Sequence, residues 1–155
     1  MKAIVCIRQG PPEGLQLREV EKPTPRDNEI LVKVYATTVN VGDCRMRSFT
    51  VPPLFWLPGR LALGITKPKN PIFGMELAGK VEAVGKDVRR FKPGDPVFAS
   101  TFALNFGAHV EYKCLPEDGV VAMKPNNLNF EEAAAVPIGA NTALYFWRKA
   151  DIQPG

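Results

Sequence analysis

The sequence is poor in cysteine and has none of the spacings that cysteine-based sites require. Its three cysteines, Cys6, Cys44 and Cys114, lie far apart along a chain of 155 residues. An odd number of cysteines without a Cys-x-x-Cys pair indicates neither a disulfide framework nor a structural zinc site. We therefore expect three reduced thiols.

Long apolar runs are also missing. No stretch approaches the roughly 20 apolar residues of a membrane-spanning helix, and residues 1–6 lack the apolar core and cleavage site of a signal peptide. These absences predict a cytoplasmic protein without a membrane span. The net charge of +4 is scattered, and no basic stripe alternates with aromatic residues, which argues against nucleic-acid binding.

A dinucleotide-binding fingerprint is the third absence. Turns that bind a pyrophosphate through backbone amides have the spacing Gly-x-Gly-x-x-Gly between a strand and a helix. Gly74, Gly79 and Gly85 instead lie on and beside one predicted strand with no helical pattern after it. The sequence therefore contains no site of its own for the pyrophosphate of a nicotinamide cofactor.

What the sequence does contain is typical of a domain built mainly of strands. Hydrophobic residues make up 45% and charged residues 23% of the chain, as in ordinary globular proteins. Residues 29–36 and 77–83 alternate apolar and polar side chains, which predicts half-buried strands. Turn signals stand at Pro93-Gly94 and at residues 116–119. Short strands between such turns predict a mainly β fold, a small and partly open barrel.

The pattern becomes helical near the end of the sequence. Asn129 and Glu132 have the spacing of a capping box, which predicts a helix start. Pro137 must break or bend that helix, and it can open a second one through residues 141–147. We expect this pair of helices to end at the turn residues 153–155.

Five motifs follow one another in a fixed order: residues 34–43, 74–85, 91–97, 107–112 and 131–137. In this order and spacing they resemble the catalytic domain of the medium-chain dehydrogenases/reductases. The resemblance implies a GroES-like, partly open β-barrel over residues 1–128 and linking helices over residues 129–155, α+β overall. It further implies that a Rossmann cofactor domain follows the linking helices and is absent here, so that this fragment alone is expected to be inactive.

The zinc branch of that superfamily binds its catalytic metal at positions that are Asn40, Met75 and Ile138 in this sequence. A catalytic zinc ion needs about three protein ligands from Cys, His, Asp or Glu. An amide, a thioether and an isoleucine do not supply them. The sequence therefore resembles the zinc-independent quinone oxidoreductase branch, and we expect no metal.

In that branch, an Asn-x-x-Asp motif with an arginine four residues later corresponds to Asn40, Asp43 and Arg47, which we expect to be the catalytic residues. The amide of Asn40 can donate to a substrate oxygen, and the positively charged guanidinium of Arg47 can donate to an anionic group. Alternatively, Asp43 and Arg47 pair with each other on a short helix. By resemblance, Thr142 binds the nicotinamide; its alternative partner is a carbonyl one turn back.

The resemblance implies an oxidoreductase that reduces a quinone, an enone or a similar small-molecule carbonyl by hydride transfer from NADPH or NADH. It is compatible with a homodimer of the full-length protein. Two other functions stay open. One is a zinc-dependent alcohol dehydrogenase with atypical ligands, with Cys44 and Glu76 near the metal. The other is a GroES-like binding module without catalysis.

An apolar insertion, Val51 to Ile65, departs from the compact family pattern. Its prolines and its Pro-Gly pair predict that it is not a single helix. We expect a flap packed on the domain's own barrel. The alternatives are a lid over the substrate cleft, a dimer contact and a membrane-surface patch.

Overall fold

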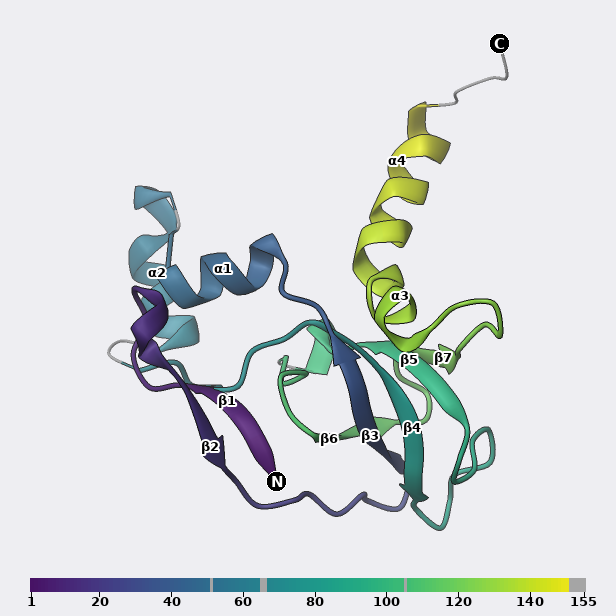
Figure 1. The fold of residues 1–155 in the computed structure, drawn as a ribbon. Helices are drawn as coiled ribbons and strands as arrows, with labels where there is room; N and C mark the ends of the chain where they lie inside the picture. Colours follow the sequence, from purple (N-terminus) through teal and green to yellow (C-terminus); the bar gives the residue numbers. More distant parts are fainter. Residues whose placement is uncertain (51, 65–66, 105, 151–155) are drawn as a thin grey trace.

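The computed structural model describes residues 1–50, 52–64, 67–104 and 106–150 (Figure 1). Its centre is an antiparallel sheet with the strand order β6-β3-β4-β5-β7, and a separate hairpin pairs β1 with β2. The strands are β1 (Lys2–Cys6), β2 (Leu15–Glu19), β3 (Glu29–Thr37), β4 (Glu76–Val84), β5 (Pro96–Ser100), β6 (Tyr112–Pro116) and β7 (Val121–Met123). The helices are η1 (Pro12–Gly14), α1 (Val41–Ser48), α2 (Pro53–Leu63), η2 (Phe102–Leu104), α3 (Phe130–Ala134), η3 (Val136–Ala140) and α4 (Asn141–Ala150).

The pairing of β3 with β4 holds the sheet together. Ile30 lies opposite Val84 and Val32 opposite Val81, with irregularities in register along the pair. At Gly79, a Cβ atom would lie 2.0 Å from the carbonyl oxygen of Lys33. Only glycine therefore lets the two strands approach this closely.

The hydrophobic core fills the inside of this curved sheet. Its largest fully buried apolar side chains come from four strands: Ile30, Val32, Leu77, Val97 and Leu115. The predicted mainly β fold is confirmed, and the two sheets do not close into a complete barrel within the described ranges. Isolated bridges between Ala3 and Val110 and between Val5 and Ile72 join β1 to the segments that precede β6 and β4.

The turns form where the sequence predicts them. Gly94 has a positive φ of 94°, and the amide of Asp95 donates to the carbonyl of Lys92, as in a turn that needs glycine at its third position. The amide of Gly119 donates to the carbonyl of Pro116. These turns fix the ends of β5, β6 and β7 within the sheet.

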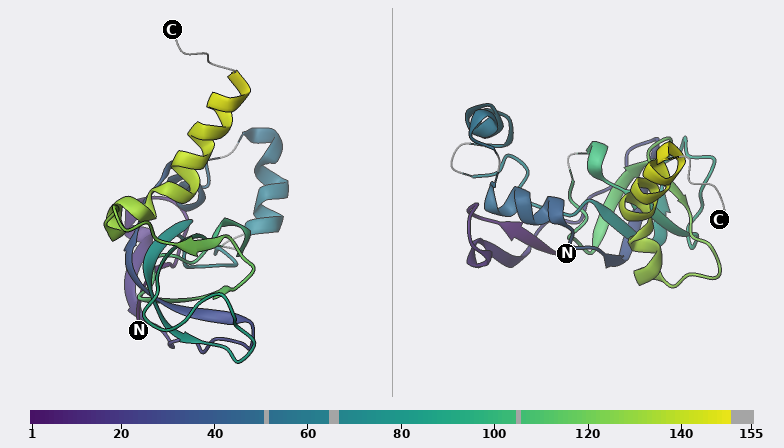
Figure 2. Two further views of the ribbon diagram at one scale, coloured as in Figure 1. Left: turned by 90° about the vertical axis from the view of Figure 1, so that its right-hand side faces the viewer. Right: turned by 90° about the horizontal axis from the view of Figure 1, so that it is seen from above.

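The capping box of α3 is confirmed, because Asn129 and Glu132 each bond the other's backbone amide. Pro137 does not simply open a second α-helix. It lies in η3, a π-helical segment between α3 and α4. Helix α4 projects away from the sheet (Figures 1 and 2), and each of its residues is exposed. The expected helix end at residues 153–155 lies outside the described residues.

The apolar insertion, Val51 to Ile65, was expected not to form a single helix and to pack on the barrel as a flap. The structure differs on both points. Most of it forms one α-helix, α2, although Pro58 lies inside. Pro53 stands in the first turn, where a missing N–H costs no hydrogen bond. The carbonyl that loses its partner to Pro58 belongs to Leu54, the most exposed large hydrophobic residue, so water can hydrate it. Helix α2 lies beside α1 and away from the large sheet (Figure 2), so it is not a flap packed on the barrel. Positions 51 and 65 lie outside the described residues.

Within the described ranges, no helix combines the length and apolar character needed to cross a membrane.

Candidate functional site

The buried carboxylate of Glu76 is the centre of the candidate site. Its Oε1 atom accepts a hydrogen bond of 2.7 Å from the hydroxyl of Thr38 and one of 3.4 Å from Nδ2 of Asn40. Its Oε2 atom accepts a bond of 2.8 Å from the backbone amide of Ile138. Three donors therefore compensate the burial of this carboxylate, and they join the end of β3, the start of α1 and η3 at one point.

Asn40 is the N-cap of α1. Its Oδ1 atom accepts from the amides of Gly42 (2.8 Å) and Asp43 (3.2 Å), while its Nδ2 atom reaches Glu76. An amide nitrogen carries two hydrogens, and the second one has no partner within the described part of the chain. The cap and Glu76 thus hold the Asn40 amide from both ends and leave one donor unused.

Asp43 is only 4% exposed, and both of its oxygens are occupied. Oδ2 accepts from the Asn40 amide at 3.0 Å, and Oδ1 accepts from the Gly74 amide at 2.9 Å. Asp43 therefore closes the capping box of α1 and fastens that helix to the segment before β4. This geometry positions Asn40 and engages each oxygen of the Asp43 carboxylate with a backbone amide.

Arg47 lies at the other end of α1. Its guanidinium donates to the carbonyl of Gly10, and the Gly10 amide donates to the Arg47 carbonyl at 2.7 Å. The alternative in which Asp43 and Arg47 form an ion pair is wrong, because each side chain bonds backbone groups on a different loop. Arg47 is thus held one helix length from Asn40.

Met75 and Ile138 meet at a hollow of about 440 Å³ between the sheet and the start of α4. Met75 also covers the first turn of α1, since a Cβ on Gly42 would lie 2.4 Å from its Cε atom. The hollow is lined by Met75, Ser100, Phe102, Pro137, Ile138, Asn141, Thr142 and Tyr145. The fold therefore brings the neighbourhoods of positions 40, 75 and 138 together.

Thr142 stands in the first turn of α4, exposed, on the wall of this hollow. The alternative in which its hydroxyl bonds a carbonyl one turn back is not what the structure shows, because that hydroxyl has no hydrogen-bond partner in the described ranges. It is the neighbouring Asn141 that bonds the Pro137 carbonyl, at 2.8 Å. The Thr142 hydroxyl is thus open to the hollow.

The donor set at the site does not fit a zinc ion. Asn40, Met75 and Ile138 offer an amide already engaged in a cap, a thioether and an alkyl group, and Glu76 is committed to three donors. Across the described residues, no three His, Cys, Asp or Glu side chains group closely enough to hold a metal. Cys44 is exposed.

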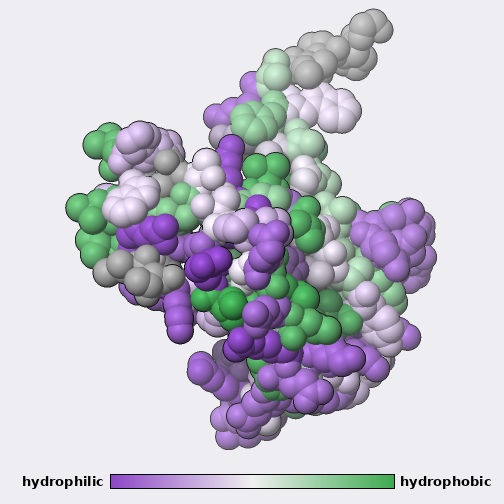
Figure 3. All heavy atoms as spheres, turned by 60° about the vertical axis from the view of Figure 1, so that its left-hand side comes forward, coloured by the Kyte–Doolittle hydropathy of each residue, from purple (hydrophilic) through white to green (hydrophobic). Residues whose placement is uncertain are grey.

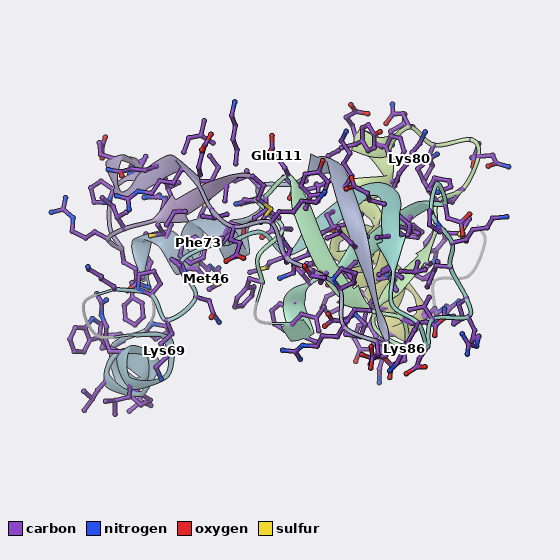
Figure 4. The ribbon with its side chains drawn as sticks, turned by 90° about the horizontal axis from the view of Figure 1, so that it is seen from below. Met46, Lys69, Phe73, Lys80, Lys86 and Glu111 are labelled. Atoms are coloured by element: carbon purple, nitrogen blue, oxygen red, sulfur yellow. The ribbon has the colours of Figure 1, made fainter. Side chains whose placement is uncertain are left out.

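A second hollow, of about 390 Å³, lies on the other side of α1. Phe73, Cys44, Arg47 and residues of β1 and β2 line it; Figure 4 shows Phe73 on this side of the molecule. His109 borders it too, and its Nε2 atom donates to the Thr38 carbonyl at 3.0 Å. This bond holds the backbone of Thr38, the residue whose hydroxyl donates to Glu76. The sequence predicts no site role for His109, and it places Glu76 at a site only in the zinc-enzyme alternative. The glycine and acid pattern at positions 74–76 was the available signal for the central place of Glu76.

Comparison with known proteins agrees with this geometry. The family of alcohol dehydrogenase GroES-like domains matches residues 26–125. A quinone oxidoreductase of Sus scrofa is 39% identical over 146 residues, which span 92% of this chain and 39% of that enzyme. A zinc-type alcohol dehydrogenase-like protein of Staphylococcus aureus is 34% identical over 125 residues, 81% of this chain and 33% of that protein.

The fold is similar to that of Escherichia coli quinone oxidoreductase complexed with NADPH. The TM-score is 0.78 at 31% identity, and the match covers 99% of this chain and 43% of that one. The chain thus spans less than half the length of these relatives. The match over residues 26–125 shows that the chain belongs to the alcohol dehydrogenase GroES-like domain family, within the medium-chain dehydrogenases/reductases.

Proposed function

We propose that this chain forms the substrate side of a zinc-independent oxidoreductase that reduces a quinone, an enone or a similar carbonyl with NADPH or NADH. The observation that carries the proposal is the unused N–H of Asn40. It stands in a frame of part-buried hydrogen bonds, and its partner Glu76 also accepts from Ile138, which lines an open hollow.

The Asn40 amide is the hydrogen-bond donor for the substrate oxygen. When a carbonyl or quinone carbon receives a hydride, negative charge develops on its oxygen. A donor fixed in advance stabilises that charge without reorganising. The cap of α1 and the carboxylate of Glu76 fix the amide, while Asp43 holds the helix that carries it. In this proposal Asp43 is a positioning residue, and Arg47 maintains the far end of the same helix.

A nicotinamide cofactor, when bound, supplies the hydride. The residues present fit the nicotinamide ring of this cofactor, since the free hydroxyl of Thr142 faces an open hollow and can bond the carboxamide of the ring. Phe102, which is 62% exposed, and Tyr145, which is 58% exposed, line the same hollow. Such aromatic faces suit a flat ring system.

The absence of zinc is part of the proposal and rests on the chemistry of Asn40, Met75 and Ile138. The similarity to a zinc-type alcohol dehydrogenase-like protein favours the second candidate, a zinc enzyme. That candidate needs at least three ligands near Glu76, and the side chains found there are not of that kind.

The test uses the protein in which this chain is joined to its cofactor-binding region. Steady-state rates with NADPH and NADH are measured against a panel of quinones, enones and aldehydes, together with the metal content. We expect turnover with a quinone or an enone and no stoichiometric zinc. One zinc per chain, with activity lost on chelation, contradicts the zinc-independent mechanism. No turnover with any pair favours a binding module.

A further inference from the structure

Helix α2 carries a stripe of exposed leucines. Leu54, Leu57 and Leu61 are 82%, 61% and 59% exposed. Their spacing of three and four residues places them on one side of the helix. No other helix face in the described ranges presents three leucines to solvent in this way. We call these residues the leucine stripe.

The opposite side of α2 fixes the helix to the body of the protein. A Cβ on Gly59 would lie 3.2 Å from the ring of Phe49, and the ring of Trp56 packs edge-on against it at 6.4 Å. The guanidinium of Arg60 lies 3.8 Å over the centre of the same ring and donates to Gln9 at 2.5 Å. These contacts hold the leucine stripe outward, so its exposure follows from how the helix is docked.

The chain around α2 is positively charged. Between Asp43 and Glu76 there is no acidic residue, and there are five basic ones: Arg45, Arg47, Arg60, Lys67 and Lys69. The two acids that bound this stretch are buried in the fold. Lys67 and Lys69 line one hollow with Arg18. The surface around the leucine stripe therefore favours a negatively charged partner.

The basic groups lie close to the helix. Lys69 donates to the carbonyl of Leu61 at 2.9 Å, and Figure 4 shows it beside α2, which is seen end-on. In the space-filling view, hydrophobic and hydrophilic surface lie side by side over this part of the molecule (Figure 3). Apolar and cationic side chains are thus presented together.

We propose that α2 binds peripherally to anionic membranes, with the leucine stripe in the boundary between headgroups and acyl chains and the exposed Arg45, Lys67 and Lys69 on the lipid phosphates. Exposed leucines next to cationic side chains are typical of surfaces that lie in this boundary. A helix of 11 residues is about 16 Å long, too short to span a bilayer. Three leucines also cover far less than the roughly 800 Å² that each partner of a stable protein interface buries.

The two tryptophans of the chain permit a direct test, since one lies on α2 and the other on α4. The variant Trp147→Phe leaves Trp56 as reporter, and Trp56→Phe leaves Trp147. Emission of each is recorded with phosphatidylcholine vesicles that contain or lack phosphatidylserine. Although Trp56 packs edge-on against Phe49, it is 50% exposed, so we expect a blue shift for Trp56 with the anionic vesicles and none with the neutral ones. A shift for Trp147 alone, or equal shifts with both lipids, overturns the proposal.

A second measurement addresses the leucines. The triple variant L54S/L57S/L61S should lower the vesicle partition coefficient at least about tenfold, since each exposed leucine contributes apolar area. It should melt close to the parent, because more than half of each leucine is exposed in the fold. The matched control L144S/F146S on α4 should bind as the parent does. If the control loses binding and the triple variant keeps it, α4 is the membrane contact and the proposal is wrong.

Salt dependence and self-association complete the test. Binding should weaken as ionic strength rises from about 0.1 M to about 1 M, over which the Debye length falls from about 10 Å to about 3 Å. Sedimentation should show the same mass for the parent and the triple variant. A parent dimer that the triple variant abolishes, without any binding to vesicles, would assign the stripe to a second copy of the chain and overturn the proposal.

Discussion

The Oε2 atom of Glu76 accepts a 2.8 Å hydrogen bond from the backbone amide of Ile138. The buried start of β4 is thereby joined to η3, the segment that carries the chain from α3 into α4. Helix α4 makes few contacts of its own with the sheet, so this bond is a main determinant of where Thr142 stands.

The substitution Glu76→Gln should destabilise the fold by about 1–3 kcal/mol, because an amide cannot accept from all three donors and leaves a buried polar group unsatisfied. Urea denaturation measures the change. The control Glu19→Gln removes an exposed carboxylate that makes no side-chain bond in the described ranges, and it should change the stability by no more than about 0.5 kcal/mol. Equal effects of the two substitutions would argue against the central role of Glu76.

The substitution Asn40→Ala should lower the turnover of the complete enzyme by about 10²–10³-fold, the loss expected for one fixed donor to a developing oxyanion. Stability should fall by only about 1 kcal/mol, through the lost cap. Asn40→Ser keeps a capping oxygen and removes the amide donor, so its turnover should fall while its melting temperature stays near that of the parent.

The other capping box supplies the matched control for Asn40. Asn129→Ala removes an equivalent N-cap from α3 and should cost about 1 kcal/mol of stability with unchanged turnover. If turnover falls equally in Asn40→Ala and Asn129→Ala, the loss at Asn40 is explained by a weaker helix cap and not by a lost donor to the substrate.

Thr142→Val replaces a free hydroxyl by a methyl group of similar size. We expect the KM for the nicotinamide cofactor to rise about fivefold, the value of one hydrogen bond of about 1 kcal/mol. The melting temperature should not change, and Thr142→Ser should restore the KM. A KM unaffected by valine would remove Thr142 from the cofactor site.

Cys114 should give a signature at alkaline pH. Burial is the largest cause that raises the pKa of its thiol from 9.0 to about 11, and the carboxylate of Glu29 adds to the effect. The folded state then retains a proton that the unfolded state has lost, so stability falls as pH rises from about 9 to about 11. Denaturation at several pH values should show this slope, and Cys114→Ala should flatten it. The same slope in the alanine variant would assign it to another group.

Thiol labelling provides a separate check. At pH 8 the exposed Cys44 should react well before Cys114, and before Cys6, whose pKa burial also raises, because the thiolate is the reacting form. Faster labelling of Cys114 than of Cys44 would contradict the burial described above.

Caps and turns could be predicted from the sequence, but hydrogen bonds between residues far apart in the chain could not. The capping box at Asn129 and the turn at Gly94 depend on residues a few positions apart. The bond between Asp43 and Gly74 crosses 31 positions and that between Glu76 and Ile138 crosses 62. No periodic pattern in the sequence predicts such bonds, so the positions of the Asp43 and Glu76 carboxylates in the hydrogen-bond network are known only from the fold.

The helix at α2 was missed for a different reason. The rule against proline inside a helix assumes that the lost backbone bond has no substitute. Here the carbonyl that loses its partner belongs to Leu54, an 82% exposed residue, where water can replace the lost bond. The partner of Arg47 was missed because Gly10 lies in a loop without a recognisable pattern. The rule for residues four apart gave Asp43 as the expected partner instead.

The π-helical geometry of Val136–Ala140 has a consequence for the direction in which α4 presents its side chains. A π-turn accommodates one residue more than an α-turn, and each residue of an α-helix advances about 100° around the axis. Removing one residue of η3 that does not line the hollow, such as Gly139, would therefore rotate Thr142 about 100° around the helix axis. The angular setting of the side chains at the start of α4 is thus encoded one turn upstream of them.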